Sequence, residues 1–86
     1  MQKVEKTEYD DKLEVCAQFK NGAVTPVSFL WRGRSYEIKK VTFTWDRRRG
    51  RSLIRHFSVS DGASLFEIAY DSEKADWRLF NICTEL

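Results

Sequence analysis

The stretch that decides the fold is residues 13–38, which read LEVCAQFKNGAVTPVSFLWRGRSYEI. Its first part, residues 13–20, alternates apolar and polar side chains, and this period of two is typical of a half-buried strand. The pair Asn21-Gly22 follows directly and favours a two-residue type I′ turn, because both central residues of that turn need a positive φ. A second strand then runs from Val24 to Trp31. Pro26 cannot donate to a ladder, so it predicts an edge or a bulge near the start of that strand.

The rest of the chain continues as strands joined by short turns. Gly33 marks a turn, and residues 35–45 are expected to form one long strand. Its apolar positions change phase at Lys39-Lys40, which predicts a β-bulge there. A polar loop over 46–51 follows. Further strands are expected over 53–60, 66–70 and 77–84, and the last of these is apolar on both sides, which indicates burial on both faces or another bulge.

A sheet of this kind has an apolar face and no helix to cover it. Either the sheet curls on itself or two copies pack face to face. Aromatic residues make up 14% of the chain and favour curling, because large rings fill the inside of a curled sheet. We therefore predict an all-β fold, a five- or six-stranded antiparallel meander curled into a half-open barrel over residues 13–86, preceded by a flexible N-terminal arm at 1–12. The predicted core consists of Val15, Phe19, Phe29, Trp31, Tyr36, Ile38, Val41, Phe43, Trp45, Phe57, Val59, Phe66, Ile68, Trp77, Leu79 and Phe80.

Length and composition restrict the class of protein. A chain of 86 residues is enough for one domain, and its net charge of +2 names no partner by itself. The N-terminus has no apolar run of the kind found in secretory signals, and nowhere do 18 apolar residues follow one another. These features predict a cytoplasmic protein that does not enter a membrane. In that compartment Cys16 and Cys83 are expected to be unlinked core thiols.

One motif resembles a known family. Residues 26–38 fit P-x-x-F-x-W-x-G-R-x-Y-x-I, and residues 66–82 add F-E-I-x-Y-D and W-x-L-x-x-I. This pattern resembles a family of small bacterial domains of unknown function built around such a hairpin. The resemblance covers about residues 13–82 and implies a stand-alone domain without an assigned activity, encoded in some genomes near DNA-damage polymerases. Family members often carry extra tryptophans where this chain has arginines at 47–51.

Basic side chains are concentrated in the middle of the chain. Residues 32–55 hold nine basic and two acidic groups, whereas both flanks are net negative. One hypothesis is a phosphate-binding loop at 47–51, with a neighbouring aromatic ring (Trp31, Tyr36 or Trp45) as a stacking platform for single-stranded nucleic acid. The other is that the arginines merely keep a sheet edge solvated. Two arginine clusters separated by an eleven-residue strand of ~35 Å need not form one patch. The candidate binding residues are Arg32, Arg34, Arg47, Arg48, Arg49 and Arg51.

No catalytic, cofactor-binding or metal-ligating motif is recognisable. The lone His56 is expected to be a half-exposed strand residue, and the acidic run at 71–76 lacks the glycine and the final glutamate of a calcium loop. The prediction is a non-enzymatic module without a cofactor, monomeric or a weak homodimer, that binds either an unknown protein partner as an adaptor or single-stranded nucleic acid. An aromatic ring exposed beside the arginines would favour nucleic acid. An enzyme is the third hypothesis and requires a cleft that holds His56 with a carboxylate.

Overall fold

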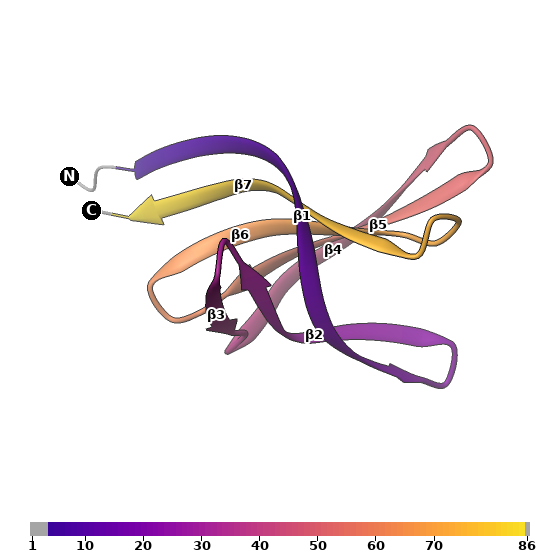
Figure 1. The fold of residues 1–86 in the computed structure, drawn as a ribbon, viewed down its shortest axis with the longest axis horizontal. Helices are drawn as coiled ribbons and strands as arrows, with labels where there is room; N and C mark the ends of the chain where they lie inside the picture. Colours follow the sequence, from indigo (N-terminus) through magenta and orange to yellow (C-terminus); the bar gives the residue numbers. More distant parts are fainter. Residues whose placement is uncertain (1–3, 86) are drawn as a thin grey trace.

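The computed structural model describes residues 4–85, which form one antiparallel sheet (Figure 1). Its seven strands are β1 (Val4–Lys20), β2 (Ala23–Trp31), β3 (Arg34–Glu37), β4 (Lys40–Arg49), β5 (Ser52–Ser60), β6 (Ser64–Asp71) and β7 (Asp76–Glu85). They lie side by side in the order β3-β2-β1-β7-β6-β5-β4. The all-β prediction is therefore confirmed, but the sheet has seven strands and is not closed into a barrel. No helix that could cross a membrane occurs within residues 4–85.

The two edges of the sheet are β3 and β4, although these strands follow each other in the chain. Two residues connect them: the Ile38 amide donates to the Val27 carbonyl oxygen at 3.0 Å, and the Lys39 amide donates to the Ser60 carbonyl oxygen at 2.8 Å. The chain thus passes within two residues from one edge of the sheet, β3, to the opposite edge, β4. The prediction of one strand over 35–45 with a bulge at Lys39-Lys40 was wrong, because a strand break shifts the apolar phase just as a bulge does.

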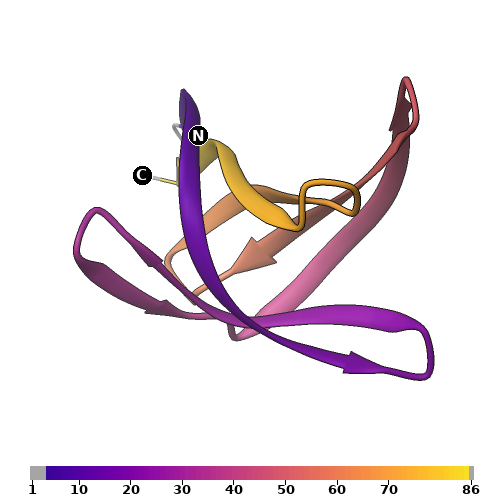
Figure 2. The same cartoon turned by 45° about the vertical axis from the view of Figure 1, so that its right-hand side comes forward.

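The long strand β1 joins the two halves of the sheet. Residues 4–13 pair with β7 and residues 14–20 pair with β2, and between them β1 bends across the molecule (Figures 1 and 2). Residues 4–12, expected to be a weakly held arm, are thus the first half of a strand; residues 1–3 lie outside the described part of the chain. The polar composition of this segment does not predict a strand. The segment is a strand because it pairs with β7, which is distant in the sequence.

The core lies inside the curl of the sheet, where β2 and β3 pack over β6. The rings of Phe29 and Tyr36 lie with their centroids 5.1 and 5.3 Å from that of Phe66. The predicted core was wrong for Phe19 and Phe43, which are each 65% exposed. It also lacked Leu13, which is buried. The buried cluster consists of Leu13, Phe29, Phe57, Val59, Phe66, Ile68, Trp77 and Leu79.

Two bulges turn aromatic side chains away from this core. The register of β4 with β5 shifts between Val41 and Phe43, so that Thr42 is an extra residue, and its hydroxyl donates to the Ser58 carbonyl oxygen at 3.0 Å. In β7 the register with β6 shifts at Phe80, so that of the two alternatives left open for the last strand the bulge is present. Because an extra residue reverses the alternation, Phe43 and Phe80 lie on the opposite face from the core. The same inversion places Trp45 on that face.

The turns largely follow their local sequence. Asn21 and Gly22 have φ of 53° and 77°, as a type I′ turn requires. The turn before β7 is held by Asp71, whose Oδ1 accepts hydrogen bonds from the amides of Glu73 and Lys74 at 2.9 and 3.1 Å. This turn ends at Ala75 with a φ of 54°, a left-handed conformation that an alanine Cβ disfavours.

Replacing Ala75 with glycine is therefore expected to stabilise the domain. Glycine adopts positive φ without steric cost, and we expect a gain of about 0.5–1 kcal/mol in the free energy of unfolding. Urea denaturation followed by circular dichroism measures it. The reverse change at Gly22, Gly22→Ala, is expected to destabilise, since φ is 77° there. A loss of stability in Ala75→Gly would contradict the strained turn.

Candidate binding groove

The face of the sheet opposite to the core is hollowed into a groove of about 570 Å³, here called the outer groove. Its side along β4 carries arginines, its floor comes from β5 and β6, and β7 with part of β1 forms the other side. The lining residues are Glu8, Tyr9, Trp45, Arg47, Arg48, Arg49, Ile54, His56, Glu67, Ala69, Asp71, Lys74, Asp76, Arg78, Phe80 and Asn81.

A row of rings crosses the floor of the outer groove. The Trp45 and His56 rings are stacked with centroids 5.1 Å apart and planes at 7°, and the Phe80 ring lies 5.7 Å from His56. On β6, Ala69 pairs with both His56 and Arg78 and is 3% exposed. A methyl group at this position leaves room for the His56 and Phe80 rings to meet above it, and so gives the groove its depth.

His56 is buried in this row rather than half-exposed, with only 8% of its surface accessible. Its Nδ1 lies 3.3 Å from Glu67 Oε2, but outside the direction of a hydrogen bond, so this nitrogen has no hydrogen-bond partner among the described residues. The other Glu67 oxygen accepts a 2.7 Å hydrogen bond from the Asn81 amide. Burial lowers the pKa of His56, Glu67 opposes that effect, and Arg47 and Arg49 add to it. The imidazole is therefore neutral at pH 7.

The outer groove does hold His56 with a carboxylate, the pair that the enzyme hypothesis required. The ring is covered on its sides by Trp45 and Phe80, which leaves little room for a substrate to reach it. Among the side chains that the structure describes, those of residues 7–84, no three metal-ligating groups come together. The arrangement provides stacked aromatic surface and fixed charge, which are features of binding.

The lowered pKa of His56 predicts a pH dependence of stability. A histidine that titrates at lower pH in the folded state than in the unfolded state takes up about one proton on unfolding between the two pKa values. Stability is therefore expected to fall as the pH drops below about 6.5, the usual histidine pKa, towards the lowered folded-state value. Urea denaturation of the wild type and of His56→Gln from pH 5 to pH 8 tests this. Below pH 6.5 the free energy of unfolding should change much less steeply with pH in the variant than in the wild type. Equal slopes would contradict the prediction.

The structure separates the arginines that the sequence grouped. Arg47, Arg48 and Arg49 belong to β4, and only Gly50-Arg51 form the turn to β5, so the predicted loop over 46–51 was wrong. Strand alternation directs Arg47 and Arg49 to the same face as Trp45, whereas Arg48 alternates to the other face and lines the groove only at its rim. Arg51 lies in the turn outside the groove.

The other candidate arginines lie in a different part of the molecule. Arg32 and Arg34 flank the β2–β3 turn, which both views place far from the β4–β5 turn (Figures 1 and 2). The Arg32 guanidinium lies 4.8 Å from the Trp31 ring centroid, and that of Arg34 lies 5.6 Å from the Tyr36 ring centroid. The two clusters therefore do not form one patch, and Trp31 and Tyr36 are already covered by a cation.

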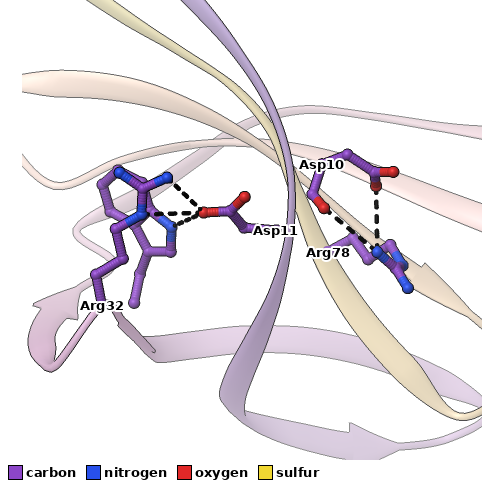
Figure 3. Close-up of polar contacts among 5 residues, drawn as sticks. Asp10, Asp11, Arg32 and Arg78 are labelled. Atoms are coloured by element: carbon purple, nitrogen blue, oxygen red, sulfur yellow. Dashed lines mark hydrogen bonds and ion pairs between the residues drawn. The ribbon is translucent and has the colours of Figure 1, made fainter.

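Two acidic residues of β1 fix the bend of this strand from both sides (Figure 3). Asp11 Oδ2 accepts a hydrogen bond from Trp31 Nε1 at 2.9 Å and pairs with Arg32 at 3.0 Å. On the other side, Arg78 Nη1 donates to the carbonyl and carboxylate oxygens of Asp10, each at 3.3 Å. The hydrogen bond from Trp31 and the charge of Arg32 lower the pKa of Asp11. Arg78 also lines the outer groove, so the bend of β1 shapes one of its walls.

Sequence reasoning missed the parts of the outer groove that lie on β6 and β7. Glu67, Ala69 and Asn81 belong to ordinary strand patterns, and only the double-sided apolar pattern of residues 77–82 indicated a second populated face. The two cysteines are unlinked, but Cys16 is exposed and Cys83 half-buried, so neither is a core thiol.

Comparison with known proteins places the chain in a family without giving it an activity. No curated protein and no solved structure matches it. A family model described as a domain of unknown function matches residues 2–84, which include every strand segment that builds the outer groove. The chain therefore belongs to the DUF6504 family of domains of unknown function.

Proposed function

We propose that this domain is a non-enzymatic protein-interaction module whose outer groove binds an acidic segment of a partner. The observation that carries the proposal is the row Trp45, Arg47 and Arg49, which lines the groove along β4. Asp46, the acidic residue between Trp45 and Arg47 in the sequence, alternates to the other face of β4 and is already paired with Arg55 at 2.9 Å. Arg47 and Arg49 thus have no free acidic neighbour on β4.

The opposite side of the outer groove favours a protein over a polyphosphate. Glu8 and Asp76 line that side, and Glu67 and Asp71 line the adjoining floor. Of the two cations on that part of the groove, Lys74 and Arg78, the second is paired with Asp10. A nucleic-acid backbone carries a charge at every nucleotide and would meet these carboxylates. A polypeptide with a few acidic residues beside apolar ones matches both the arginines and the exposed aromatic surface.

Single-stranded nucleic acid is the second candidate, supported by one observation. Trp45 is half-buried, stacks on His56 with one face and lies beside the groove-lining arginines. A half-exposed ring next to cations is the arrangement in which bases stack while phosphates are neutralised. A short oligonucleotide that contacts only the β4 side would avoid the carboxylates of the opposite side and the floor.

A titration with two fluorescent probes separates the candidates. The probes are a 15-residue peptide of alternating glutamate and valine and a 15-nucleotide oligothymidine, each at 50 and 200 mM salt. We expect the peptide to bind more tightly, and Arg47→Ala/Arg49→Ala to weaken it at least tenfold, since each desolvated charge pair contributes on the order of 1 kcal/mol. Arg51→Ala is the matched control and should bind like the wild type.

The other outcomes have definite meanings. Tighter binding of the oligonucleotide, with quenching that Trp45→Phe reduces, would replace the proposal by the nucleic-acid function. Failure of the peptide to bind at 50 mM salt, or equal losses in the Arg47/Arg49 variant and the Arg51 control, would overturn the groove as the binding site.

A further inference from the structure

We infer that the partner segment binds as an additional strand, antiparallel to β4, along the open edge of the sheet. This inference rests on the proposed function and specifies how the acidic segment is held. Its starting point is the position of β4 at the end of the strand order, beside the outer groove that β4 also lines.

The edge of β4 is long and open. Among the strands that the structure describes, β5 alone packs against β4. Lys40–Arg49 pairs with β5 on one side, which leaves the outward-facing amides and carbonyls of β4 without a strand partner. The other edge, β3, has four residues against ten in β4. An exposed edge of this length is the usual template for strand addition by an extended peptide.

Charge decides which strand fits this edge. Lys40 lies at one end of β4 and Arg47, Arg48 and Arg49 lie at the other, while Asp46 is held by Arg55. A second copy of β4 would bring cations opposite cations, and like charges directly opposite each other destabilise a strand pair. The arginines thus act against self-pairing, as edge charges commonly do, yet the same charges attract an acidic strand. The occupant is therefore an acidic segment of another protein.

The side-chain order along β4 predicts the sequence of that segment. On the groove side β4 presents Phe43, Trp45, Arg47 and Arg49 at every second position, apolar first and basic last. Phe43 is 65% exposed, packs beside Trp45 at 5.6 Å, and gains cover from an apolar side chain on an added strand. An antiparallel partner meets this order in reverse. Its sequence is expected to read acidic-x-acidic-x-apolar-x-apolar.

Two labelled peptides of equal composition test the pattern by fluorescence anisotropy with the whole domain. TETETVTYT places both glutamates on one face of a strand, whereas TTEETVYTT places adjacent glutamates on opposite faces. We expect the first to bind about tenfold more tightly. Phe43→Ala should weaken TETETVTYT several-fold, while Phe19→Ala, the matched control with the same 65% exposure on β1, should not.

Backbone methylation of the peptide tests strand addition itself. In an added strand every second amide donates to β4, so N-methylation of one alternate set should abolish binding and N-methylation of the other set should leave it intact. If both sets leave binding intact while Arg47→Ala/Arg49→Ala still abolishes it, strand addition is overturned and the proposed function stands. If no acidic peptide binds, the proposed function itself fails. A dimer in sedimentation equilibrium that Arg47→Glu/Arg49→Glu changes would place a second copy on β4 and also overturn the inference.

Discussion

Replacing Trp77 with alanine is expected to lower the free energy of unfolding by about 3–5 kcal/mol, which is enough to unfold much of the population. The indole is 7% exposed and lies against Phe57 and Tyr70, with ring centroids 5.6 and 5.0 Å away. Alanine would leave a cavity at the junction of β5, β6 and β7. A domain of 86 residues has a total stability of about 4–13 kcal/mol, so few such losses are tolerated.

The matched control for Trp77→Ala is Trp45→Ala. Trp45 is half-buried on the outer groove, and its loss removes the stack on His56 without opening the core. We expect a cost of about 1–2 kcal/mol and a folded protein. Guanidinium denaturation followed by circular dichroism compares the two variants directly. Equal losses would mean that the core and groove faces have been assigned to the wrong sides of the sheet.

The local features of the fold were predictable because short stretches determine them. Asn21-Gly22 fixes a hairpin wherever alternating strands flank it, and Pro26 lies beside the register shift between Cys16 and Ala17 that its missing amide suggested. The two-sided apolar pattern of residues 77–82 likewise left a bulge as one of two alternatives, and the structure places it at Phe80. In each case the physical cause lies within a few residues of the feature.

The remaining features depend on partners far away in the sequence. Residues 4–12 carry no apolar period, and they form a strand because β7 offers an open edge. The break at Ile38-Lys39 has the same apolar phase as a bulge, and only the hydrogen bonds to β2 and β5 distinguish the two. Long-range pairing of this kind leaves no trace in a single sequence.

The outer groove was unpredictable for a related reason. Thr42 lies within the strand expected over 35–45, yet as a bulge it moves Phe43 and Trp45 from the expected core to the opposite face, where Trp45 lines the outer groove. The arginines at 47–49 were expected in a loop, but they belong to β4. In a loop all of them would be free to converge, whereas in β4 alternation divides them between two faces.

Exchanging the charge of the groove-lining arginines is expected to reverse the specificity of the domain. Arg47→Glu/Arg49→Glu should lose more than tenfold in affinity for TETETVTYT and gain measurable affinity for TKTKTVTYT, in which lysines replace the glutamates. A charge exchange of this kind restores attraction only if the side chains of both partners lie opposite each other. Anisotropy titrations of both peptides at 50 mM salt measure the reversal.

The control must separate contact from net charge. Arg34→Glu/Arg51→Glu changes the net charge from +2 to −2 just as the groove variant does, but alters residues that lie outside the outer groove. A purely electrostatic attraction by the whole domain would weaken both variants equally, because it depends on total charge and is screened by salt. If Arg47 and Arg49 contact the peptide, only Arg47→Glu/Arg49→Glu changes the preference from TETETVTYT to TKTKTVTYT.

His56 provides an independent readout of the same variant in the free protein. Arg47 and Arg49 help to lower the pKa of His56, so their replacement by glutamates is expected to raise it, whereas Arg34→Glu/Arg51→Glu should leave it nearly unchanged. The chain has one histidine, so a single imidazole resonance in an NMR titration reports it. An unchanged pKa together with lost binding would mean that the two arginines turn away from the row of rings, and the peptide would then be held at the rim of β4 rather than in the outer groove.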